Sequence, residues 1–198
     1  RESFAGLPVD MLTSLNVGLQ YQLDRYDYKA NHAAYDLSDK YFLSLAYTGR
    51  VLRRSGNDFA GGHGLAVSVG KWYTPLSSWR LGLDYGYYGA APRYMSLALS
   101  ADYMFNLSAF TAGYNSDRLF DLIALGGVYA GVGNSQKKNE FVYGVRAGVQ
   151  GRFNVSSGID LFIEPQLLAS RVSRNDNGLG FDPEARLMVG LNYKLGGN

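Results

Sequence analysis

Large apolar residues alternate with small or polar residues along most of the chain after residue 40. In residues 79–87, the odd positions hold Trp, Leu or Tyr, and the even positions hold Arg80, Gly82, Asp84 and Gly86. Successive side chains of a β-strand point to opposite faces of a sheet, so this period predicts strands. We predict strands at residues 41–50, 63–74, 79–88, 93–107, 119–132 (with its faces unassigned, since both are small or apolar), 140–154, 159–171 and 184–195.

The lengths of these strands and the character of their two faces indicate a membrane barrel. Strands of globular proteins typically have about 5–6 residues, whereas a tilted strand that crosses a bilayer needs about 9–11. The apolar face is the larger one and carries Tyr, Trp and Phe at its ends, as in barrels whose outer surface meets lipid between two aromatic girdles. A soluble β-barrel is the alternative. The pattern favours an all-β, eight-stranded antiparallel transmembrane barrel with up-and-down topology.

The connections between the strands suggest an orientation. Turns on the periplasmic side of outer-membrane barrels are short, and outer loops are longer. We place the turns at Pro75 and at 156–157 in the periplasm, which makes the polar segments 51–63, 133–139 and 172–183 external. The segment 108–118 is rich in Gly and Asn and is predicted to be a link. Eight strands then leave both ends of the barrel in the periplasm.

The first forty residues do not fit this frame. Residues 15–23 alternate like a further strand, but a ninth crossing would break the even count, and 24–40 is polar. We therefore divide the chain into an N-terminal extension, 1–40, outside or beside the barrel, and the barrel, 41–198. A ten-stranded barrel is the alternative.

Composition supports this class and excludes others. The chain has 25 Gly and 16 Tyr, only 18% charged residues, and no apolar run of the 18 or more residues that a membrane helix needs. The net charge of +2 is too small to indicate a nucleic-acid partner. There is no cysteine, which excludes disulfides and thiol chemistry. The first residues do not resemble a signal peptide, so we expect an outer-membrane protein whose signal peptide has been removed.

The residues that could carry chemistry are few, and we expect neither catalysis nor a cofactor. Both histidines, His32 and His63, fall in predicted connections. The predicted inward faces hold four cations and four carboxylates, and a barrel of eight strands is only wide enough for its own side chains. Buried charges must be paired, so we interpret them as a structural ion-pair network in place of an active site or an open pore. Its members are Arg80, Asp84, Asp102, Arg146, Arg152, Asp160, Glu164 and Arg186.

Several short motifs stand out between residues 70 and 197: GKWYTP (70–75) with RLG (80–82), DYMFNL (102–107), GYNSDR (113–118) and GLNYKLGG (190–197). These motifs resemble those of the OmpA-like outer-membrane proteins of Bacteroidetes, over about residues 41–197. The chain departs from the family at Ser78, where a turn glycine is expected, and at Leu195, where a terminal aromatic is usual. In that family, a periplasmic peptidoglycan-binding domain normally follows the barrel; this chain holds none, and we expect the natural protein to continue past Asn198.

The resemblance implies a non-enzymatic barrel that anchors the cell envelope. The alternatives are an accessory subunit of a larger outer-membrane complex for protein insertion, secretion or nutrient uptake, and a small channel. The expected partners are outer-membrane lipid and lipopolysaccharide, peptidoglycan through the missing domain, and other outer-membrane proteins. The basic pairs Arg53-Arg54 and Lys137-Lys138 lie in predicted outer loops and are expected to be solvated.

Overall fold

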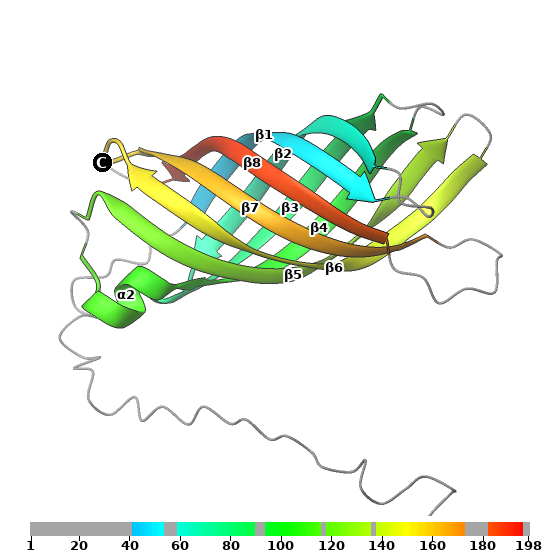
Figure 1. The fold of residues 1–198 in the computed structure, drawn as a ribbon. Helices are drawn as coiled ribbons and strands as arrows, with labels where there is room; N and C mark the ends of the chain where they lie inside the picture. Colours follow the sequence, from blue (N-terminus) through cyan, green and yellow to red (C-terminus); the bar gives the residue numbers. More distant parts are fainter. Residues whose placement is uncertain are drawn as a thin grey trace, which may run out of the picture. The chain divides into compact units, whose positions relative to one another are not determined.

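The computed structural model describes residues 41–53, 59–89, 94–115, 118–135, 138–172 and 182–195, which form one closed antiparallel barrel with the strands in chain order (Figure 1). Because β1 also pairs with β8, the sheet has no free edge. The eight-stranded prediction is confirmed and the ten-stranded alternative is wrong. The extension 1–40 lies outside the described residues. The strands are β1 Tyr41–Arg53, β2 Phe59–Trp72, β3 Ser77–Tyr88, β4 Tyr94–Asn106, β5 Phe120–Ser135, β6 Lys138–Asn154, β7 Ile159–Val172 and β8 Asp182–Leu195.

Two of the predicted outer loops are largely strand. The ladder between β1 and β2 continues to the pair Arg53 and Phe59, and the ladder between β5 and β6 to the pair Ser135 and Lys138. The prediction of loops at 51–63 and 133–139 is therefore wrong over most of their length. Backbone groups pair whatever the polarity of their side chains, so Gly-rich and polar residues extend the strands here. Most of the third predicted loop, 172–183, lies outside the described residues.

The link between β4 and β5 contains a helix that the sequence pattern did not predict, α2 (Leu107–Ala112), at one end of the barrel (Figure 1). The side chain of Asn106 caps this helix by accepting a hydrogen bond from the Ala109 amide at 2.9 Å. Gly113 ends it with a φ of 78°, a backbone conformation that favours glycine. The helix is too short to show a hydrophobic period, which explains why only its cap and its terminating glycine signal it.

Outward side chains form an apolar band between two aromatic groups. Leu83, Leu99, Val145 and Leu187, which lie near the middle of their strands, all point outward and are exposed. Aromatic pairs lie nearer the strand ends. At the end that carries α2 these are Trp79 with Tyr103 and Phe120 with Phe153; toward the other end they are Tyr47 with His63 and His63 with Tyr87.

His63 differs from its predicted position. It lies within β2 on the outward face, with its ring between those of Tyr47 and Tyr87 at centroid distances of 6.3 and 5.4 Å. The prediction of a loop residue is wrong because β2 begins at Phe59. His63 thus belongs to the aromatic group on the outer surface.

Candidate functional site

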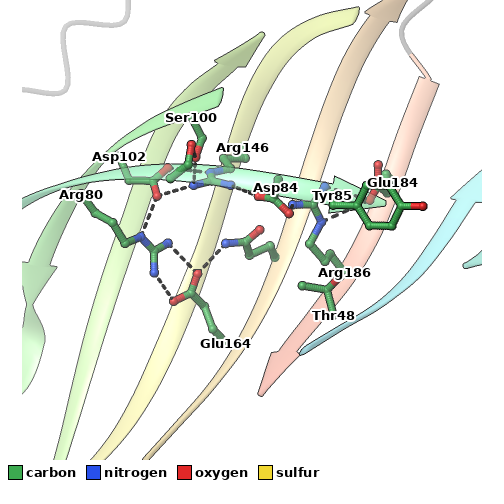
Figure 2. A network of polar contacts seen from close by, with 12 residues as sticks. Thr48, Arg80, Asp84, Tyr85, Ser100, Asp102, Arg146, Glu164, Glu184 and Arg186 are labelled. Atoms are coloured by element: carbon green, nitrogen blue, oxygen red, sulfur yellow. Dashed lines mark hydrogen bonds and ion pairs between the residues drawn. The ribbon is translucent and has the colours of Figure 1, made fainter. Parts of the chain in front are cut away.

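The interior of the barrel holds a continuous ion-pair network drawn from six strands (Figure 2). Each member stands at an inward position of its strand, which follows from the alternation that sends the intervening apolar residues outward. All of their side chains are at most 8% exposed. The network contains four cations and four anions: Arg50, Arg80, Arg146 and Arg186 with Asp84, Asp102, Glu164 and Glu184.

Arg80 on β3 joins two carboxylates. Its Nη1 and Nη2 donate to the two oxygens of Glu164 at 2.8 and 2.7 Å, and its Nε donates to Asp102 at 2.9 Å. The paired bonds to Glu164 match the planar fork of a guanidinium to a carboxylate, a strong and directional arrangement. Arg80 therefore connects the β3–β4 side of the wall to β7 across the lumen.

Arg146 on β6 makes the second bridge. Its Nε donates to Asp102 at 2.6 Å, and its Nη1 donates to Asp84 at 3.2 Å. Its Nη2 donates to Ser100 at 2.8 Å and also bonds to Asp102. Asp102 is fully buried and is held by both Arg80 and Arg146. Without these two guanidinium groups, the buried carboxylate would be an uncompensated charge, which costs several kcal/mol.

Asp84 connects the centre of the network to a third group of charges. Arg50 donates to one of its oxygens at 2.6 Å, and Arg186 lies 3.0 Å from the same oxygen. Arg186 also donates to Glu184 at 3.2 and 3.1 Å, and Arg50 lies 4.0 Å from Glu184. This chain of contacts makes the eight charges one network with no net charge.

Two glycines make the space that Arg50 occupies. Gly64 and Gly86 are paired across β2 and β3. A Cβ on Gly64 would lie 2.0 Å from the carbonyl oxygen of Tyr85 and 3.0 Å from Nη2 of Arg50. A Cβ on Gly86 would lie 2.5 Å from Nη1 of Arg50. The inward glycines therefore admit a guanidinium where a larger residue would displace it.

A second, smaller cluster lies at the end of the barrel that carries α2. Arg152 lies 2.6 Å from Asp121 and 3.9 Å from Asp160. Lys194 lies 2.8 Å from Asp160, and Arg118 lies 3.4 Å from Asp121. We call these five residues the turn-end cluster. It has three cations and two anions, and its cations are 15–29% exposed.

An apolar cluster separates the two groups of charges. On β5, Ile123 and Leu125 are the next inward residues after Asp121, and on β4, Met104 is the next after Asp102. These three side chains pack with Phe42. Of the eight residues predicted for one network, the structure thus joins six, and it places Arg152 and Asp160 in the turn-end cluster.

The residues that sequence reasoning missed are Arg50, Glu184, Asp121, Lys194 and Arg118. Arg50 continues the inward series of its strand, and Glu184 and Lys194 stand at polar positions, so the alternation could have found all three. Asp121 is the second residue of β5, the strand whose faces the pattern left unassigned. Arg118 precedes that strand, and no periodicity places it.

The chemistry that this interior offers is charge neutralisation. Each carboxylate of the central network is paired with at least one guanidinium. Among the residues that the structure describes, no three His, Cys, Asp or Glu side chains group as a metal site. The described part also contains no helix long and apolar enough to cross a membrane.

Known structures of the same architecture match the chain. Neisserial surface protein A aligns with a TM-score of 0.57 and 13% identity, covering 78% of this chain and 96% of that protein. Ail, the attachment invasion locus protein of Yersinia pestis, aligns with a TM-score of 0.51 and 12% identity, covering 79% of this chain and 98% of Ail. No family model and no curated protein sequence matches. The fold is that of the eight-stranded outer-membrane β-barrels, and at these identities the likeness extends to the fold alone.

Proposed function

We propose that the protein is a non-enzymatic, integral barrel of the outer membrane whose role is structural. The observation that carries the proposal is the lumen: a neutral, buried ion-pair network spans it from β3 and β4 to β7 and β8. Each charge of this central network is paired with an opposite charge, so none of them is left to bind substrate or to line a water column. The network therefore favours a sealed barrel, and it argues against a channel or a barrel enzyme.

The outer surface supports insertion into lipid. Exposed Leu and Val residues cover the middle of the strands, and exposed aromatic residues lie toward both ends. An apolar surface of this extent in water would be costly and prone to association, whereas lipid tails cover it at no such cost. The partners of this surface are outer-membrane lipid and lipopolysaccharide.

Two leucines of similar exposure provide the test of membrane insertion. Leu99 is 68% exposed in the middle of β4, and Leu119 is 70% exposed just before β5 begins. Leu99→Arg should destabilise the barrel in liposomes by about 2–4 kcal/mol, the cost of a cation near the midplane of a bilayer. Leu119→Arg should cost less than about 1 kcal/mol, because it lies near the interface. Equal, small costs for both would contradict insertion.

The specific role that we propose is anchoring of the envelope, with a periplasmic domain after Asn198 that binds peptidoglycan. The resemblance of residues 41–197 to OmpA-like proteins motivates it. Intact mass of the protein isolated from its native membrane tests the extension: a species markedly heavier than 21.7 kDa supports it, and one near 21.7 kDa refutes it.

Rescue of a deletion strain tests whether the role is structural. The wild-type gene should restore resistance of the envelope to detergent. His63→Ala should restore it equally, because a structural role does not depend on the one histidine of the described residues. Loss of rescue by His63→Ala at normal barrel levels would indicate a chemical role.

A further inference from the structure

One seam of the barrel wall is interrupted. The ladder between β6 and β7 pairs residues up to Gly148 with Gln166 and resumes at Gly151 with Ile163, so two successive residue pairs are missing from this seam, although the same residues are paired with β5 and β8 on their other sides. The ladders of the other seven seams run without a gap through the described residues. In a membrane, backbone groups of the wall have no water to bond to, so such a gap is costly and needs a compensating contact.

The cause of the gap is Pro165. It stands opposite Val149 in the interrupted register, and proline has no amide hydrogen to donate to a ladder. Its carbonyl oxygen points toward β6, since a Cβ on Gly148 would lie 2.5 Å from it. The amide and carbonyl of one strand residue face the same neighbouring strand, so the missing donor is the one that would have met β6.

A side-chain contact crosses the seam where the backbone pairing is lost. Gln150 on β6 donates from Nε2 to Oε2 of Glu164 on β7 at 2.6 Å, and these two residues form the other missing pair. Both side chains are at most 1% exposed. Glu164 is fixed from two further sides, by the fork of Arg80 and by Nε2 of Gln166.

We propose that the β6–β7 seam is the built-in opening point of this barrel and that the hydrogen bond from Gln150 to Glu164 is the clasp that holds it closed. On the lumen side, this side-chain hydrogen bond compensates for the backbone hydrogen bond between β6 and β7 that Pro165 removes. It also couples the closure of the wall to the ion-pair network, because the arginine that orients the carboxylate of Glu164 belongs to that network.

Residue-resolved hydrogen exchange of the folded barrel in lipid nanodiscs tests the proposal. Gln150→Leu removes the donor at similar size and should speed exchange of residues 147–151 and 163–167 by at least about tenfold. The matched control is Ser44→Ala, which removes a buried bond of 2.6 Å to Asn192 between directly paired residues of the intact β1–β8 seam. It should leave exchange in its own seam within about threefold of wild type. Equal acceleration of all seams by Gln150→Leu, or none, would overturn the clasp.

A second variant tests the cause independently and does not weaken the barrel. Pro165→Val restores an amide at an outward position, where it can donate to the carbonyl of Val149, and it should slow exchange at Val149 in an otherwise wild-type chain. Combined with Gln150→Leu, it should return exchange in this seam to near the wild-type rate. Unchanged exchange in the single variant would show that the seam is not weakened by Pro165 and would overturn the proposal.

Discussion

The central network and the turn-end cluster use the same residue types but differ in burial and charge balance. In the central network, four cations face four anions and every side chain is at most 8% exposed. In the turn-end cluster, three cations face two anions, and the cations reach 15–29% exposure. Ile123, Leu125 and Met104 pack between the two.

The difference shows which of the charges hold the barrel together. A buried charge that loses its partner remains in a medium of low polarity, and the cost is several kcal/mol. A charge near the mouth of the lumen regains water when its partner is removed, and exposed ion pairs contribute little. Removal of any one charged side chain from the central network should therefore destabilise the barrel strongly. The turn-end cluster should tolerate removal of its surplus cation.

The largest effect is expected for Arg146→Ala. It leaves Asp102, which is fully buried, with Arg80 as its one remaining partner, withdraws one partner from Asp84, and gives the buried network a net negative charge. The free energy of unfolding should fall by about 3–5 kcal/mol. Urea-induced unfolding in liposomes measures it, with Ser44→Ala as the control for a buried side chain outside the network. A loss below about 1 kcal/mol would show that the network is not a stabilising unit.

A smaller effect is expected in the coupling of Arg80 to Glu164. Each single substitution to Met leaves one buried charge without its main partner, whereas the double substitution removes both. The loss of unfolding free energy in the double variant should therefore be smaller, by about 2 kcal/mol, than the sum of the losses in the two single variants. A coupling of this size is within the range for residues in contact. A double-mutant cycle on urea midpoints measures this energy. Strict additivity would mean that the forked contact does not form.

The smallest effect is expected for Arg118→Ala at the turn end. Asp121 keeps Arg152 at 2.6 Å, so no carboxylate is stranded. The loss should be at most about 1 kcal/mol and should shrink in high salt. The same urea series, run at two salt concentrations, measures it. A loss as large as that of Arg146→Ala would remove the distinction between the two regions.

The wall and its two faces follow directly from the sequence. Alternation at every second residue predicts which side chains of β3 and β8 point inward, and both Arg80 and Arg186 lie there. Strands that are long enough to cross a bilayer and have an apolar outer face then predict a closed antiparallel barrel, because lipid cannot satisfy a free sheet edge. The ends of strands are less predictable, because residues such as Ser135 and Lys138 pair through their backbones with no hydrophobic signal.

The partners within the lumen could not be predicted in the same way. Alternation shows that Arg152 and Arg80 both point inward, but the stagger of the strands decides which carboxylate each one meets. Arg80 meets Glu164, which is 84 residues away in the chain, while Arg152 meets Asp121 in a strand whose faces the pattern left unassigned. The interruption at Pro165 likewise appears only once the register of β6 and β7 is known.

The most direct test of the account is single-channel recording of the folded barrel in planar lipid bilayers. The neutral network of paired charges that Figure 2 draws should block the narrow lumen, so we expect no steady ionic current at moderate voltage. Arg146→Ala, measured in parallel, reports whether conductance appears when the network is broken. Reproducible ohmic steps from the wild-type barrel would contradict a sealed lumen and would favour a channel.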